Sequence, residues 1–199
     1  ACNYDELADI DNNSCNYTCV NSGSYSLLFD AAGSSVTELH NLNIPETDLI
    51  TFSIDFKLDD YIHQSNHNHI FDLEGGPVRY TLVAGPDYME MRFEGYSLSF
   101  PFEADVLDSQ WHNINVQATS NSVNIYLDGI SVVSESWDSP SVQHVYPGGE
   151  AFLGANDRSS QYGYFMKGQL DNFIISGSLL SFEDIKNLNF DNNLMAYYM

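Results

Sequence analysis

Acidic residues spaced two apart are the pattern in this sequence that could carry out catalytic chemistry. Glu90-Met91-Arg92-Phe93-Glu94 places Glu90, Arg92 and Glu94 on one face of an extended chain. Two carboxyl groups that flank a glycosidic bond can hydrolyse it, one of them as the general acid. Arg92 would keep both neighbouring carboxylates ionised, which removes the raised pKa that a general acid needs. We therefore interpret the three residues as a solvent-facing ion pair across strands and expect no enzymatic activity.

A stretch rich in histidine and asparagine could bind a transition metal or line a ligand site. His63, His67 and His69 lie close together in it, and imidazole suits zinc or copper. No orienting partners for such a metal can be identified in the sequence. We favour a polar, ligand-facing loop at the rim of the fold over a metal site.

Aromatic side chains in polar loops are further candidates for ligand binding. Sugar-binding sites combine aromatic faces, which stack on pyranose rings, with amide and carboxylate groups that bind the hydroxyls. Four such residues lie in or beside loops rich in Gly, Ser, Asp and Gln: Trp137, Tyr146, Tyr162 and Tyr164. The alternative for each is packing at the edge of a sheet.

The cysteines are confined to the start of the chain. Cys2, Cys15 and Cys19 are the three cysteines of the sequence. This clustering predicts a small disulfide-held segment in an oxidising compartment, with one thiol left over. Asn12 and Asn16 each begin an N-glycosylation sequon, which is exposed if the chain is secreted.

The same segment contains a possible calcium loop. Asp9, Asp11 and Asn13 alternate as the oxygen ligands of calcium loops do. Ser14 stands where glycine usually makes the sharp turn, and no glutamate closes the loop. A calcium site and a metal-free loop held by disulfides both remain open.

Composition excludes two classes of partner. The 199 residues carry 28 Asp and Glu against 6 Lys and Arg, a formal net charge of −22. A chain this acidic is repelled by nucleic acid and by anionic lipid. The sequence also contains no run of about 18 apolar residues, the length needed to insert into a membrane. The acid either keeps the protein soluble in a salty extracellular medium or supplies calcium ligands.

Alternating apolar residues predict strands along most of the chain. Between Ile50 and Leu58, apolar and polar residues alternate strictly, so one face of this strand should be buried and the other wet. Asp128-Gly129 marks a tight hairpin. A single helix is expected at 181–188, with Ser181 as N-cap. Short strands joined by turn residues predict an antiparallel sandwich. The other expected strands are 25–30, 69–74, 79–84, 88–94, 96–102, 111–118, 123–127, 130–133, 151–154 and 194–198.

The closing stretch of the chain resembles that of laminin-G-like domains of the concanavalin-A-like lectin/glucanase superfamily. Gly168-Gln169-Leu170-Asp171-Asn172-Phe173-Ile174-Ile175, followed by Leu180-Ser181-Phe182-Glu183-Asp184-Ile185, matches the form "G-x-(I/L)-D-x-(V/F)-x-I…L-S-x-E-x-I". Further blocks in matching order extend the resemblance over about 25–190. The resemblance implies an all-β, antiparallel jelly-roll sandwich. It also implies that Trp111, in a "W-H" block, is a structural residue of the core.

The resemblance also implies two sites for calcium. In the pentraxin branch, a loop and the residues after "L-G" in a later strand supply oxygen ligands. In this sequence those positions are Asn66, His67, Asn68, Asn156 and Asp157. They would bind calcium weakly or bind sugar hydroxyls directly.

The second implied site is a structural calcium that bridges the two ends of the domain. Asp171 would supply a carboxylate to it, and the region of Asp30 would supply a backbone or side-chain oxygen. Hydrogen bonds from backbone N–H groups are the alternative role for Asp171.

The two ends of the chain carry their own signals. Residues 1–20 resemble a short cysteine-containing repeat of secreted microbial proteins, so we divide the chain into this leader and a sandwich over 21–199. The final segment, 193–199, resembles a strand that opens or completes modules in tandem arrays. We expect it to add an edge strand to this sandwich, the alternative being pairing with another module.

These patterns favour a non-catalytic recognition module of a secreted or cell-surface protein. It would bind glycan or an extracellular protein through its loops, with calcium as a possible cofactor. The alternative is a structural subunit of an extracellular fibre or array, which would self-associate through the cysteine leader and the C-terminal strand.

Overall fold

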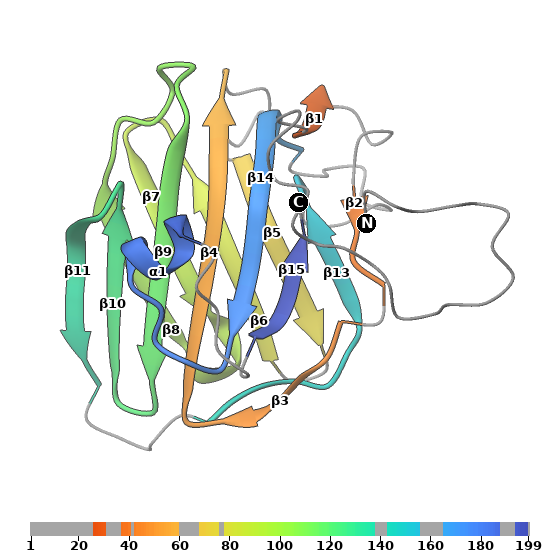
Figure 1. Cartoon of the computed structure of the whole chain (residues 1–199), viewed down its shortest axis with the longest axis vertical. Helices are drawn as coiled ribbons and strands as arrows, with labels where there is room; N and C mark the ends of the chain where they lie inside the picture. Colours follow the sequence, from red (N-terminus) through yellow and green to blue (C-terminus); the bar gives the residue numbers. More distant parts are fainter. Residues whose placement is uncertain are drawn as a thin grey trace, which may run out of the picture.

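Two antiparallel sheets lie face to face in the computed structural model of the chain, and one short helix lies on the outer face of one of them (Figure 1). The structure describes residues 26–30, 37–40, 42–59, 68–75, 78–137, 143–155, 165–187 and 194–198. The first sheet has the spatial order β1 (Leu27–Asp30), β14 (Lys167–Ser176), β4 (Leu49–Leu58), β9 (His112–Thr119), β10 (Ser122–Leu127) and β11 (Ile130–Ser136). In addition, β15 (Leu194–Tyr198) pairs with β14.

The second sheet forms the other layer. Its order is β2 (Thr37–Glu38), β13 (Glu150–Leu153), β5 (Asn68–Gly75), β6 (Val78–Ala84), β7 (Tyr88–Phe93) and β8 (Leu98–Glu103). A separate ribbon pairs β3 (Ile44–Thr47) with β12 (His144–Tyr146), and the helical elements are η1 (Glu94–Tyr96) and α1 (Phe182–Lys186). This confirms the predicted all-β jelly-roll sandwich with one short helix near its C-terminal end.

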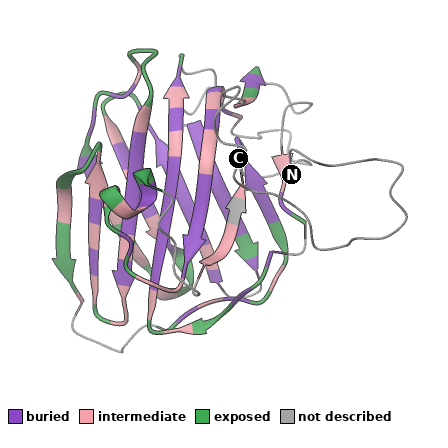
Figure 2. Ribbon diagram, in the orientation of Figure 1, coloured by how far each residue is buried: buried purple, intermediate pink, exposed green. Residues whose placement is uncertain are grey.

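Aromatic rings from both sheets fill the space between the layers. Phe52 of β4 lies 5.5 Å from Phe71 of β5 and 5.2 Å from Tyr80 of β6, centroid to centroid. Full burial of a side chain of this size stabilises the fold by about 1.5–3 kcal/mol. Figure 2 shows the central strands β4 and β14 largely buried and the outer strand β11 largely exposed.

The outer face of β4 differs from the sequence expectation. We expected its polar residues to be wet, but Thr51 and Ser53 are completely buried. The segment before α1 covers them: the Thr51 hydroxyl donates to Ser178 O at 2.7 Å and accepts from Leu180 N at 3.2 Å. An apolar–polar alternation cannot reveal this cover, because it comes from residues about 130 positions away.

The two ends of the described domain meet along β14. β1 pairs with its first half, with Leu27 opposite Leu170, and β15 pairs with its second half, with Tyr198 opposite Phe173. The C-terminal strand therefore completes its own sandwich, as predicted.

The helix begins where the sequence places it. The Ser181 hydroxyl accepts from Asp184 N at 3.1 Å, and Asp184 Oδ2 accepts from Ser181 N at 3.0 Å, which together form a capping box. Ile185 packs with Ile174 and Leu180 in a small apolar cluster that fixes α1 to the first sheet.

Candidate functional site

A cavity of about 610 Å³ opens on the outer face of the first sheet, beside α1. It lies over β14, β4 and β9, the three strands at the centre of this sheet (Figure 1). Phe182, Ile185 and Lys186 of α1 form one wall, and Ser26 lies ahead of β1 on the opposite side. Both strand order and helix docking are therefore needed to form it.

The floor of the cavity is a row of polar side chains on neighbouring strands. Asp171 of β14 lies opposite Asp55 of β4, and Asp55 lies opposite Asn113 of β9. Asp128, in the turn after β10, continues the row, because its Oδ1 accepts from Asn113 N at 2.8 Å. We call these four residues the polar row. They share a face because directly opposed residues in antiparallel strands point to the same side.

A bulge in β14 adds a fifth polar group to this floor. Leu170 and Phe173 are both buried in the core, three positions apart, whereas a regular strand places core residues two apart. The pairing of β14 with β4 shifts between Asp171 and Ile174, and Asn172 adopts φ of 50°. Asparagine tolerates this left-handed conformation better than most residues. Its amide then donates to Asp55 Oδ2 at 2.8 Å.

Two carboxylates face each other in this arrangement. Asp55 is neutralised in part by hydrogen bonds, since Asn113 Nδ2 donates to its Oδ1 at 2.7 Å and Asn172 donates to its Oδ2. Asp171 accepts only one bond within the described part of the chain, from Asn172 N to Oδ1 at 2.8 Å. Burial raises the pKa of Asp171, and the nearby charge of Asp55 adds to the increase.

One polar atom at the floor lacks a partner. Asn113 is 8% exposed, and its Oδ1 makes no hydrogen bond to any described residue, although its Nδ2 also donates to Ser53 Oγ at 3.1 Å. A buried acceptor without a partner is costly, by about 1–3 kcal/mol, unless a ligand or water supplies a donor.

Trp111 lies at the mouth of the cavity and corrects a sequence prediction. We expected this residue in the core, but it is 46% exposed and lines the cavity. It precedes β9 and lies on the side of Asn113, whereas the core begins only with Ile114. The resemblance located the strand correctly but not the direction in which this side chain points.

His112, next to Trp111, is held between two carboxylates. Its Nδ1 lies 2.8 Å from Asp128 Oδ2 and its Nε2 lies 3.1 Å from Asp108 Oδ1. Burial opposes the charged ring, but the two hydrogen bonds outweigh it and raise the pKa of His112. The contacts fix the chain beside Trp111 and hold Asp128 in the polar row.

Chemically, this cavity can bind a ligand that supplies hydrogen-bond donors and an apolar face.

Comparison with known proteins agrees with the sandwich fold described above. Residues 30–186 match the profile of the Laminin G 3 family, concanavalin A-like lectin/glucanases superfamily. The chain belongs to this lectin/glucanase superfamily.

Solved structures of similar fold include binding proteins of several kinds. A candidate carbohydrate binding protein from Bacteroides ovatus shares 15% identity at a TM-score of 0.61, covering 82% of this chain and 47% of its own. The LG4-5 domains of the mouse laminin alpha1 chain share 12% sequence identity with our chain at a TM-score of 0.55, and the match covers 76% of our chain and 40% of theirs. The CBM40 module of the Ruminococcus gnavus IT-sialidase, bound to alpha2,3 sialyllactose, shares 11% sequence identity at a TM-score of 0.55. This match covers 77% of our chain and 96% of the module.

Our chain thus spans less than half of the first two structures. No curated protein sequence matches it. None of the helices among the described residues is long and apolar enough to cross a membrane. These similarities establish the fold of this lectin/glucanase domain and the family to which it belongs.

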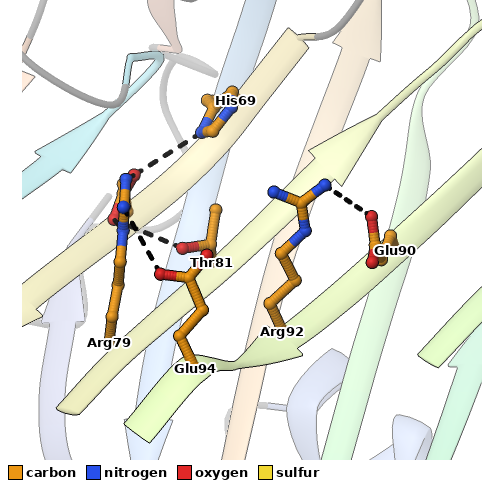
Figure 3. Close-up of polar contacts among 7 residues, drawn as sticks. His69, Arg79, Thr81, Glu90, Arg92 and Glu94 are labelled. Atoms are coloured by element: carbon orange, nitrogen blue, oxygen red, sulfur yellow. Dashed lines mark hydrogen bonds and ion pairs between the residues drawn. The ribbon is translucent and has the colours of Figure 1, made fainter. Parts of the chain in front are cut away.

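The outer face of the second sheet carries the acidic pattern that we weighed as catalytic (Figure 3). Arg92 donates to Glu90 Oε2 at 2.6 Å, and Ser99 also donates to Glu90. Glu94 lies 3.4 Å from Arg79 instead. The carboxylates are thus in ion pairs, as we interpreted them, but the predicted pairing across strands is corrected: Glu90 and Arg92 pair within β7, and Glu94 of η1 pairs with Arg79 of β6.

Arg79 belongs to a second, more buried part of this network. Its Nε donates to Asp72 Oδ1 at 2.8 Å and its Nη2 to Asp72 Oδ2 at 2.5 Å, while Thr81 donates to Oδ1 at 3.3 Å. Asp72 is completely buried. Both carboxylate oxygens are thus already bonded, which gives this network a structural role.

Two of the predicted ligand-binding residues are described, and both have internal partners. Asn68 is buried in β5, where its Oδ1 accepts from Lys167 N at 3.4 Å. Trp137 packs 5.7 Å from Phe100 and 6.2 Å from Phe93, and its indole N–H donates to Ser120 O at 2.8 Å. Edge packing accounts for these contacts of Trp137. Tyr146, a further aromatic candidate, is buried, and burial raises its pKa to about 12.

The proposed pair of calcium ligands does not converge. Asp30 lies opposite Lys167, four residues along β14 from Asp171, so the backbone positions of the two residues are offset by roughly 13 Å along the strand at about 3.3 Å per residue. Asp171 instead faces Asp55. No cluster of three His, Cys, Asp or Glu residues suited to a metal occurs among the described residues. The register thus separates the side chains of Asp30 and Asp171, and a calcium site that uses a backbone oxygen near Asp30 stays a prediction.

The other predicted site residues lie outside the described residues. These are the ligand positions Asn66, His67, Asn156, Asp157, Tyr162 and Tyr164, the leader positions Asp9, Asp11 and Asn13, the cysteines Cys2, Cys15 and Cys19, and the sequons at Asn12 and Asn16. Their roles stay predictions.

Sequence reasoning found Asp171 but missed its neighbours in the cavity. The spacing of Leu170 and Phe173 was an available signal, because two polar residues between core positions require a bulge. Asp55 and Asn113 also occupy outward positions of predicted strands. Nothing in the sequence set these two apart, because only the register of the sheet makes them neighbours.

Proposed function

We propose that this domain is a non-catalytic glycan-binding module of a secreted or cell-surface protein, and that the cavity beside α1 is its binding site. The single observation that carries the proposal is Trp111, whose ring is exposed at the mouth of a cavity floored by the polar row. An exposed aromatic face next to fixed amide and carboxylate groups is the combination that binds pyranose rings.

Three further facts support this proposal. The cavity volume, about 610 Å³, falls within the range of small-molecule sites. Asp55, Asn113 and Asp171 of the polar row lie on strands, and Asp128 lies in the tight turn after β10, so the row is held in place before the ligand arrives. Among proteins of similar fold, one is a candidate carbohydrate binding protein and another is bound to alpha2,3 sialyllactose.

A role in adhesion follows if the domain recognises glycans on another cell or matrix. An extracellular protein partner is the alternative ligand. The cavity variant described below would distinguish the two ligands, because its binding to each can be measured separately. Assembly into fibres or arrays has less support, because β15 already pairs within its own sheet.

The test is binding to a glycan array with two matched variants. Trp111→Ala removes the stacking surface and is expected to lower affinity for the best glycan at least tenfold, about 1.4 kcal/mol. Ile130→Ala removes an exposed apolar side chain at the β10–β11 turn, outside the cavity, and should bind as the parent does. Equal binding by both variants would refute the assignment of this cavity.

A further inference from the structure

The charge of the cavity bears on which glycans it accepts. Among the described residues that line it, Asp55, Asp128 and Asp171 are acidic, and Lys186 is the one permanent cation. His112 adds a positive charge when protonated, but it is held between Asp108 and Asp128. The surrounding protein reinforces the negative field, since the net charge of the chain is −22.

The hydrogen-bonding groups of the floor also favour a ligand that donates, because unused acceptors outnumber unused donors. The amide groups of Asn113 and Asn172 both donate to Asp55, so these donors are already used. Asp171 Oδ2 remains as an acceptor, because the one bond to Asp171 within the described part of the chain goes to Oδ1. Asn113 Oδ1 also lacks a partner among the described residues, but it is enclosed by the protein. A ligand at this floor must therefore supply donors.

A sugar hydroxyl can donate, whereas a carboxylate or sulfate group can only accept. An anionic group placed on this floor would face the Asp55 and Asp171 carboxylates, with Lys186 of α1 as the one permanent cation among the described lining residues. Two like charges at about 4 Å repel strongly in a partly buried site.

We propose that the cavity selects neutral glycans and rejects those whose bound end carries a carboxylate or sulfate. The hydroxyls donate to Asp171, and the apolar face of the ring stacks on Trp111. This inference rests on the proposed function and names its ligand class. It separates this domain from the CBM40 module bound to sialyllactose, a sugar with a carboxylate, despite their shared fold.

The experiment compares pairs of glycans in which one member is neutral and the other carries one carboxylate, either on an added sugar or in place of a hydroxymethyl group. Lactose and alpha2,3 sialyllactose form one pair, and cellobiose and cellobiouronic acid form another. The whole chain is titrated with each glycan at low ionic strength. In every pair of which at least one member binds, the affinity for the neutral member should be at least tenfold higher than that for the acidic member. Added salt should narrow this ratio, because it screens the repulsion.

Asp171→Asn supplies the second measurement. It keeps the shape and one acceptor oxygen but removes a charge, so the ratio between neutral and acidic glycan should fall several-fold. Glu135→Gln, an equivalent charge change on β11 outside the cavity, should leave the ratio unchanged.

The outcomes separate the two proposals. Tighter binding of the acidic member, with loss on Trp111→Ala, would overturn the selectivity and leave the glycan site in place. An unchanged ratio in Asp171→Asn would also overturn it. Absence of binding by neutral and acidic glycans alike would overturn the glycan site itself.

Discussion

Asp171 and Asp55 lie directly opposite each other on adjacent antiparallel strands, with both carboxylates on the outer face of the first sheet. Like charges in this relationship destabilise a sheet. Asp55 is satisfied by two amide groups, whereas Asp171 accepts one backbone bond within the described part of the chain. The fold thus keeps an unfavourable pair at the cavity beside α1, which is a cost that ligand binding can offset.

Replacing Asp171 by asparagine should therefore stabilise the domain at neutral pH. A raised carboxyl pKa means that the folded state holds its proton more tightly than the unfolded chain, so the contribution of Asp171 is favourable at low pH and is lost as pH rises through its folded pKa. At pH 7 the variant should gain about 0.2–1 kcal/mol, at the low end because the pair is partly exposed.

Urea unfolding at pH 7 and pH 3 checks this prediction. The gain should disappear at pH 3, where the carboxyl is protonated in the folded and unfolded states, since a free Asp titrates at about 3.9. A variant that is less stable than the parent at pH 7 would show that Asp171 is bound to a cation or donor that favours its charge.

His112 should titrate above the pKa of a free histidine, about 6.5. Burial disfavours its charged form, but the hydrogen bonds that the protonated ring donates to Asp128 and Asp108 outweigh this and raise its pKa. This stabilisation is therefore fully present below pH 6.5 and is lost as pH rises through the folded pKa. NMR titration of the ring protons measures the midpoint directly. Asp108→Asn should lower it, and a midpoint unaffected by this change would contradict the contact.

Thr51→Val should destabilise the domain although it preserves side-chain shape. The change removes the bond to Ser178 O and leaves the buried Leu180 N–H without its acceptor, at a cost of about 1–3 kcal/mol. Because this segment leads into α1, glycan affinity should fall as well. Thr37→Val in β2, far along the second sheet, is the matched control for both measurements. Equal stability of the two variants would remove the role assigned to Thr51.

Calcium stays a prediction from the sequence, carried by the leader and by the loop positions outside the described residues. A cation that binds only the folded state must raise the melting temperature. We expect millimolar calcium to raise it for the whole chain and EDTA to reverse the effect. An Asp30→Asn variant should respond as the parent does, because this residue does not converge with Asp171. Loss of the response in this variant would contradict that conclusion.

The fold was largely predictable, and the binding site was not. Alternation along β4, the Asp128-Gly129 turn and the Ser181 cap are local signals, so each predicted element appears close to its expected bounds. The cavity depends on pairing between β14, β4 and β9, residues more than 50 positions apart along the chain. Trp111 shows most clearly what the sequence could not predict. The strand beside it was identified, but the side to which the Trp111 side chain points depends on the residue at which the alternation of core and outward positions begins.

The two tryptophans of the chain allow the central claim to be tested in one measurement. Trp111 is exposed at the cavity, whereas the indole N–H of Trp137 is bonded to Ser120 O in the packed edge of the sandwich. In a ¹⁵N-labelled sample titrated with a neutral oligosaccharide, the indole signal of Trp111 should shift progressively and that of Trp137 should stay in place. A shift of the Trp137 signal alone, or of neither signal under conditions where the sugar binds, would contradict a binding site beside α1.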